Sequence, residues 1–358
     1  MLSWIEPRFS NSRIKTAGKR IRENNYSLED ILVLENHRAS HTYIMNTFNS
    51  NLRRRSRGQP IVVAQRLKRR NTIFDKLKRE PNMQLSTMHD IAGIRLIFQD
   101  QHQLNMFRDR LHKAKFDYIL RTRDDDRYIY ILNPKDTGYR GIHDVYEYRV
   151  RSRQGEKWNG LLIEIQYPTK FQHAWATAVE AADFINTSQI KFDDADYHHK
   201  EFFRYASEII ARAYEQQNSC LTNLSSGEIV DQFRAIDRRV GLLRAFRNLQ
   251  KAQSETRFRT TTILIFDFEK SGEHKSLRME TFDSVNRAIS RYEALEKELA
   301  GRADIVLVRS DTPEAIRDAF RNYFSDVNEF LTYVDDGRAM LHSFCTHQSA
   351  APSTTDIC

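Results

Sequence analysis

The chain contains 358 residues, 40% of them apolar and 29% charged, and its formal net charge is +8. These proportions are typical of a globular protein with enough residues to bury a core, and they exclude disordered and collagen-like chains. No apolar run approaches the roughly 18 residues of a membrane-spanning helix, and no signal peptide is evident. The three cysteines are scattered and indicate neither disulfides nor a zinc ribbon. We therefore expect a cytoplasmic protein without a membrane partner.

The first third of the chain is predicted to be helical with one interruption. Apolar residues recur at helical spacing over residues 1–50, and Gly58 and Pro60 then break the pattern. The segment RLKRRNTIFDKLKRE, residues 66–80, is typical of a basic amphipathic helix that ends at Pro81.

Positive charge is concentrated in the same part of the chain. Residues 51–80 carry eleven lysines and arginines against two acidic residues, so this segment accounts for nearly all of the net charge. Such a field attracts polyanions, including nucleotides, RNA and acidic surfaces, although a solvated helix face would have the same composition.

The central part of the chain mixes strands and helices. Apolar or alternating patterns predict strands in residues 89–100, 143–150 and 160–167, and a strand, an acidic turn and a second strand in residues 121–132. Helical periodicity is found in residues 104–116, 171–185 and 201–217.

The C-terminal part reads as a small α/β unit. Ser225 or Ser226 is expected to cap a helix over 228–252. A strand (260–269), a helix (276–300), a strand (303–310) and a helix from 312 then follow, and the two strands are predicted to pair in parallel through a crossover. The predicted domains are 1–220, with the motifs in 66–180, a helical linker in 221–255, an α/β unit in 256–340 and a flexible tail in 341–358.

An acidic residue within an apolar strand is the first sign of chemistry. Glu164 interrupts LLIEIQY, and a buried charge without a partner would cost several kcal/mol. A metal ion or a cationic group would remove this cost, whereas an edge strand would let the side chain face water. Asp90 enters another strand, and the basic segment precedes it. Two carboxylates from separate strands and a cluster of cations are typical of a Mg²⁺–nucleotide site.

Four segments together resemble a known family. RLKRRNTIFDKL, HDIAGIRLIF, NPKDTGYRGIH and LLIEIQYPTKFQHAWATAVE, in this order and spacing, are similar to the synthetase domain of RelA/SpoT-type (p)ppGpp synthetases over roughly residues 25–215. The resemblance implies an α+β fold, with a mixed nucleotidyltransferase-like sheet flanked by helices. It also implies transfer of the β,γ-pyrophosphate of ATP to the 3′-hydroxyl of GDP or GTP, with Mg²⁺ as cofactor.

The resemblance assigns roles position by position. Asp90 matches the Mg²⁺ ligand, and Glu164 matches a second acid that assists the metal or acts as general base. For ATP, Arg66 and Arg95 match the pair that encloses adenine, and Lys68 and Lys76 match phosphate contacts. On the acceptor side, Tyr139 matches the residue that stacks on the base, and the remaining matches are Lys135, His143, Gln166 and His173.

Departures from the family pattern gather around the acceptor. They are Thr72, Ile129, Gly141 and Pro168. They leave open a second interpretation, a toxin that places pyrophosphate on the 3′-CCA end of tRNA and would have a neutralising partner, with residues 51–70 as the RNA-binding patch. A third is a non-catalytic regulatory protein with a synthetase-like fold. A homo-oligomer is compatible with each of the three.

Overall fold

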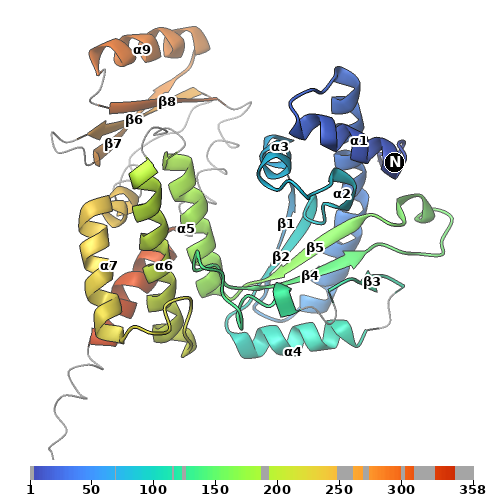
Figure 1. Cartoon of the computed structure of the whole chain (residues 1–358), viewed down its shortest axis with the longest axis horizontal. Helices are drawn as coiled ribbons and strands as arrows, with labels where there is room; N and C mark the ends of the chain where they lie inside the picture. Colours follow the sequence, from blue (N-terminus) through green and yellow to red (C-terminus); the bar gives the residue numbers. More distant parts are fainter. Residues whose placement is uncertain are drawn as a thin grey trace, which may run out of the picture. The chain divides into compact units, whose positions relative to one another are not determined.

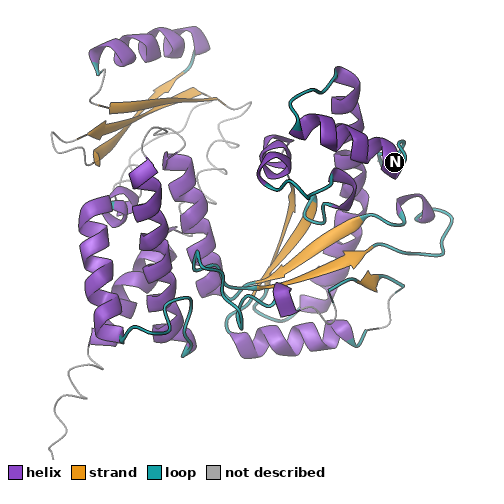
Figure 2. Ribbon diagram, in the orientation of Figure 1, coloured by secondary structure: helices purple, strands orange, loops and turns teal. Residues whose placement is uncertain are grey.

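The structure is a computed structural model of the chain. It describes residues 4–68, 70–114, 117–122, 126–186, 193–247, 261–268, 274–299, 303–309 and 327–342. The chain divides into two compact units, one made of residues 1–133 and 141–170 and the other of residues 134–140 and 171–358. The first unit contains a mixed sheet, and the second contains a helical core and a smaller sheet (Figures 1 and 2).

The sheet of the first unit has five strands in the order β1-β2-β5-β4-β3. Strands β2 and β5 are parallel, and the other neighbouring pairs are antiparallel. The predicted mixed sheet is thereby confirmed. The strands are β1 (Val62–Leu67), β2 (Ala92–Ile97), β3 (Ile119–Leu120), β4 (Ile142–Glu147) and β5 (Leu162–Tyr167).

Helices cover one face of this sheet. Phe48 and Leu52 of one helix and Leu104 and Phe107 of another pack in a single core with Ile165 and its neighbours on the central strands. The longest helix begins at the capping box of Ser27 and ends at Ser56, just before the predicted break. The helices of this unit are α1 (Asn11–Arg22), α2 (Leu28–Ser56), α3 (Arg70–Arg79) and α4 (Gln101–His112).

Two predictions in this unit are wrong. The helix predicted over 66–80 begins only at Arg70, because the preceding residues form the edge strand β1 against β2. Arg66 therefore lies on a strand, whereas Lys76 lies on α3. The second strand predicted in 121–132 is a short 3₁₀ helix (Asp126–Tyr128) and a turn, with one bridge between Ile129 and Ile142.

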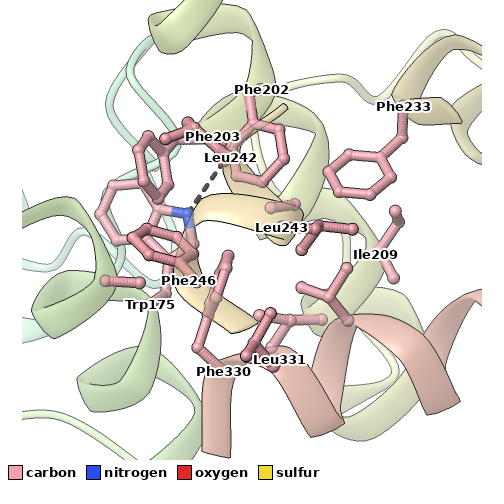
Figure 3. Packing of buried hydrophobic residues seen from close by; sticks show 14 of the residues in the cluster. Trp175, Phe202, Phe203, Ile209, Phe233, Leu242, Leu243, Phe246, Phe330 and Leu331 are labelled. Carbon is pink, nitrogen blue, oxygen red and sulfur yellow. Dashed lines mark hydrogen bonds between the residues drawn. The ribbon is translucent and has the colours of Figure 1, made fainter. Parts of the chain in front are cut away.

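The second unit is built on a helical core rich in aromatic rings (Figure 3). Ser225 caps α7 through a capping box with Glu228, as predicted, and Gly241 ends the helix in the left-handed conformation. Residues 242–247 and 327–342 are also helical. The long helices are α5 (Lys170–Asn186), α6 (Asp193–Glu215) and α7 (Ser226–Val240).

The smaller sheet differs from its prediction in one strand and in direction. Residues 274–282, expected to lie before or within a helix, form a strand that pairs with the strand before it as a hairpin, and the order is β7-β6-β8. Alternating Leu277 and Met279 between polar residues fit a strand. β8 is antiparallel to β6, so the parallel pairing predicted for these two strands is wrong. The elements are β6 (Thr261–Phe268), β7 (His274–Phe282), α9 (Val285–Glu298) and β8 (Ala303–Arg309).

This smaller sheet is an insertion in the helical core. Phe246 lies before it and Phe330 after it, and their ring centroids are 6.0 Å apart. The helix over 327–342 buries Phe330, Val334 and Leu341 in the same cluster as α5, α6 and α7. The chain thus leaves the core after residue 247 and returns to it by residue 327. The helix start predicted near residue 312 and most of the predicted tail, residues 343–358, lie outside the described residues.

Candidate functional site

Polar side chains converge on one face of the central strands of the first unit. Arg95, Gln166 and His143 occupy one cross-strand row on β2, β5 and β4, and Glu164 lies two residues before Gln166 on β5. Residues in one row, or two apart on a strand, share a face of the sheet. The opposite face, which carries Ile94 and Ile165, is the one that packs in the helix-covered core.

Glu164 is buried and hydrogen-bonded on both oxygens. The Nδ1 atom of His143 lies 3.1 Å from its Oε1, Nε2 of His89 lies 3.5 Å from the same oxygen, and the Gln166 amide donates to Oε2 at 2.6 Å. Burial opposes ionisation, but His143, His89 and Gln166 outweigh it and lower the pKa of Glu164 well below its usual value. Glu164 is therefore an anion at neutral pH, and its strand does not turn it toward bulk water.

Asp90 forms a second charged centre just before β2. Its Oδ2 atom accepts hydrogen bonds from the ammonium groups of Lys68 at 2.9 Å and Lys76 at 3.0 Å. Burial again opposes ionisation, and the two lysines outweigh it, so the pKa of Asp90 is lowered. The helix α3 brings Lys76 to this position because Ile73 and Leu77 anchor it in a core with α1 and α2.

The second carboxylate oxygen of Asp90 fits a hard cation. Oδ1 is buried and has no hydrogen-bond partner, although a buried polar atom normally has one. Within the described residues, no group of three or more His, Cys, Asp or Glu side chains is placed to hold a metal ion. A cation here would take most of its ligands from phosphate and water, as Mg²⁺ prefers.

The residues matched to ATP binding lie beside these carboxylates in the sheet. Arg66 on β1 pairs with Gly93 on β2, which in turn pairs with Glu164 on β5. Because the middle position is glycine, no side chain stands between Arg66 and Glu164. Arg95 shares this face, two residues beyond Gly93. Two guanidinium groups on neighbouring strands can enclose a flat ring, since Arg stacks on aromatic faces.

Three residues matched to the acceptor belong to the second unit. Lys135 and Tyr139 lie in the turn 134–140, with the ammonium group 5.3 Å from the centre of the tyrosine ring. The same ring meets Trp175 of α5 edge-on, at a centroid distance of 6.2 Å. His173 is a half-buried residue of α5. The structure therefore gathers eight matched residues in the sheet unit and leaves these three in the helical unit.

Sequence reasoning missed two aromatic residues of the sheet site. His89 contacts Glu164, and Tyr130 meets the ring of His143 edge-on at 5.3 Å. The signal for His89 was its position next to Asp90, but a single dipeptide has little weight without the fold. Tyr130 precedes β4 in a turn, and only the bridge between Ile129 and Ile142 brings it to the site.

Comparisons with known proteins agree with the motifs. Residues 65–188 match the family model described as a region found in RelA / SpoT proteins. The GTP pyrophosphokinase YjbM of Bacillus subtilis (strain 168) is 32% identical over 124 residues, which are 34% of this chain and 56% of the relative. The chain thus spans about half the length of the curated relative that it matches.

Solved structures resemble part of the chain. The small alarmone synthetase 1 of Bacillus subtilis is 26% identical, with 49% of this chain and 89% of that chain covered and a TM-score of 0.41. A GTP pyrophosphokinase family protein of Streptococcus pneumoniae is also 26% identical, with 59% and 97% covered and a TM-score of 0.40. No helix in the described part of this chain has the length and apolar character needed to cross a membrane. Residues 65–188 thus match the region found in RelA / SpoT proteins, and the resemblance indicated by the four sequence motifs is confirmed.

Proposed function

We propose that the chain is an ATP-dependent pyrophosphokinase that makes (p)ppGpp from GDP or GTP. The observation that supports this most directly is Asp90, which holds two lysines on one oxygen and keeps the other buried and unpartnered. The adjoining face of the sheet carries an ionised Glu164 within the region that matches RelA / SpoT proteins. The relative named GTP pyrophosphokinase supports the same reaction class.

In this proposal the donor lies against the first unit. Arg66 and Arg95 enclose the adenine ring, and Lys68 and Lys76 bind phosphate oxygens. Lys68 and Lys76 already contact the Asp90 carboxylate, so they are placed to exchange part of that contact for phosphate oxygens. Asp90 would hold Mg²⁺ through Oδ1, with Glu164 as the second acid, and the bound ion would neutralise charge on the phosphates.

The reaction is a displacement at the β-phosphorus of ATP. The 3′-hydroxyl of the acceptor gives up its proton, with Glu164 as the candidate base, and its oxygen forms the new bond to that phosphorus. The bond to the oxygen bridging the α- and β-phosphates breaks, and AMP leaves. Such transfers need mainly positioning and neutralisation of charge. For the acceptor, the resemblance gives Tyr139 the role of stacking on the base and gives Lys135, His143, Gln166 and His173 the role of further acceptor contacts.

A labelling experiment tests the donor, the acceptor and the catalytic carboxylate together. The protein is incubated with Mg²⁺, ATP labelled at the γ-phosphate and, in separate tubes, GDP, GTP or deacylated tRNA. We expect label on the guanine nucleotide and release of AMP. Asp90→Asn should abolish transfer, whereas the matched control Asp75→Asn, an exposed acid on α3, should not. Equal transfer by the two variants would contradict the role of Asp90. No transfer by the unmodified protein to any acceptor would instead support a non-catalytic protein.

A second candidate acceptor is the 3′ end of tRNA. Arg53, Arg54 and Arg57 are exposed at the end of α2, and none of them forms an ion pair with an acidic side chain in the part of the chain that the structure describes. A tRNA backbone would bind such a patch mainly through its phosphates. Label on tRNA alone would establish this candidate, and replacing the three arginines by glutamine should then reduce labelling most strongly at low salt, where phosphate contacts contribute most to binding.

A further inference from the structure

The turn that carries Tyr139 is attached to α6 on both sides of this residue. On the first side, the hydroxyl of Ser207 donates to the carbonyl oxygen of Gly138 at 2.6 Å. Ser207 is itself buried and shares a hydrogen bond with Ser219 at 2.9 Å. Gly138 has a φ of +87°, and a Cβ atom there would lie 2.9 Å from that of Ser207. Glycine thus allows the turn to approach α6 this closely.

On the other side, Arg140 forms a buried ion pair with Glu215. The side chains of both residues are 3% exposed. Glu215 also accepts a hydrogen bond from the Gln172 amide at 3.0 Å, and Arg140 donates to the Gln217 side chain at 3.1 Å. A buried pair with these additional hydrogen bonds has one favourable geometry, and loss of either partner leaves the other charge uncompensated.

Tyr139 therefore lies between two fixed neighbours. Its own side chain is half-buried against Trp175. The helix that provides both attachments is itself anchored in the aromatic core through Phe202 and Ile209 (Figure 3). The backbone that carries this ring has lost its conformational freedom before a ligand arrives, and this lowers the entropic cost of binding.

We infer that Ser207 and Glu215 are positioning residues that hold Tyr139 in place for stacking on the acceptor base. The inference rests on the proposed function, because it takes Tyr139 as the acceptor-binding residue. It adds two residues outside the region that matches RelA / SpoT proteins, which ends at residue 188. Neither residue touches the acceptor in this assignment, and both act by holding Tyr139. Their loss should therefore weaken acceptor binding. The binding of ATP, which is assigned to the first unit, should not change.

Calorimetric titration of the full chain tests this assignment separately from catalysis. The Kd for GDP and the Kd for a non-hydrolysable ATP analogue are measured for Ser207→Ala and Glu215→Gln. Loss of one hydrogen bond should raise the GDP Kd about five-fold in Ser207→Ala, and loss of a charged partner should raise it ten-fold or more in Glu215→Gln. Glu215→Asp, which keeps a carboxylate for Arg140, should recover part of the affinity.

Glu201→Gln is the matched control on α6. Its carboxylate pairs with Arg204 on the same helix and is not part of the attachment of the turn, so both Kd values should stay as in the unmodified protein. An unchanged GDP Kd in Ser207→Ala, or an equal rise for GDP and the ATP analogue, would overturn the inference. If Glu215→Gln does not fold, Ser207→Ala decides the outcome. If the unmodified protein binds neither nucleotide, the proposed function fails, which is a different result.

Discussion

Asp144 provides a direct test of how the sheet of the first unit is held to its helices. Its carboxylate is fully buried on β4, and Arg108 of α4 donates to it through two nitrogens, with the shortest contact at 2.7 Å. His112 of α4 lies 2.6 Å from its other oxygen. Replacing Asp144 by asparagine keeps the shape but removes the negative charge, so Arg108 remains largely buried without an anion.

The expected effect of Asp144→Asn is large. Removing one partner of a buried ion pair costs about 3–5 kcal/mol. With a urea dependence of about 2 kcal/mol per molar, the midpoint of unfolding should fall by about 1.5–2.5 M. Asp109→Asn is the matched control, because Asp109 is an exposed residue of the same helix and its loss should change stability by no more than about 0.5 kcal/mol.

Urea titration followed by far-ultraviolet circular dichroism measures both midpoints. A shift in Asp144→Asn no larger than that in Asp109→Asn would refute the reasoning. The pH dependence of stability provides a second test of the same ion pair. Burial opposes ionisation of Asp144, but His112 and Arg108 outweigh it and lower its pKa. Its stabilisation is complete above the unfolded pKa of about 3.9 and is lost as pH falls through the lower folded pKa. The stability gap between variant and parent should therefore narrow in strong acid.

Three further predictions address acid stability, the donor site and the acceptor turn. Burial lowers the pKa of His37 to about 3 and that of His41 to about 4, so between pH 6.5 and 4 only the unfolded chain takes up these protons. Urea titrations should therefore show several kcal/mol of lost stability over this range, and an unfolding midpoint that stays constant with pH would contradict this prediction. A Cβ atom at Gly93 would meet its neighbours at ordinary van der Waals distance, so Gly93→Val should keep the urea midpoint of unfolding. The new side chain would stand between Arg66 and Glu164, so pyrophosphate transfer should fall at least ten-fold, and unchanged transfer would show that this position does not face the donor. Gly138→Ala should lower the melting temperature by several degrees, because the new methyl group meets Ser207 at a positive φ, and an unchanged melting temperature would show that the turn tolerates a side chain.

The sequence was most informative where a residue conflicts with its surroundings. Glu164 stood out because an acid in an apolar strand needs a partner, and the structure provides His143, His89 and Gln166. The central strands β2, β4 and β5 were also predictable, since each has its own apolar pattern. Asp90 could be assigned to the same site as Glu164 only from the four motifs together. Its two lysines, Lys68 and Lys76, come from segments that meet it only in the folded chain.

Features that depend on pairing between distant segments were not predictable. The basic residues around Arg66 suit a helix locally, and only the pairing with β2 makes them a strand. The residues of β7 also fit a helix locally, and only their pairing with β6 makes them a strand. No local signal assigns the turn 134–140 to the helical unit, because its attachments, Ser207 and Glu215, lie about 70 residues further along the chain.

The return of the chain to the helical core affects the order in which the protein can mature during synthesis. Every segment of the sheet unit has been translated by residue 170, so that unit can fold early. The core that supports Tyr139 still lacks Phe330, Val334 and Leu341 at that stage, and these residues are translated only after the smaller sheet. A nascent or truncated chain would therefore contain the charged sheet face without a finished support for the acceptor turn.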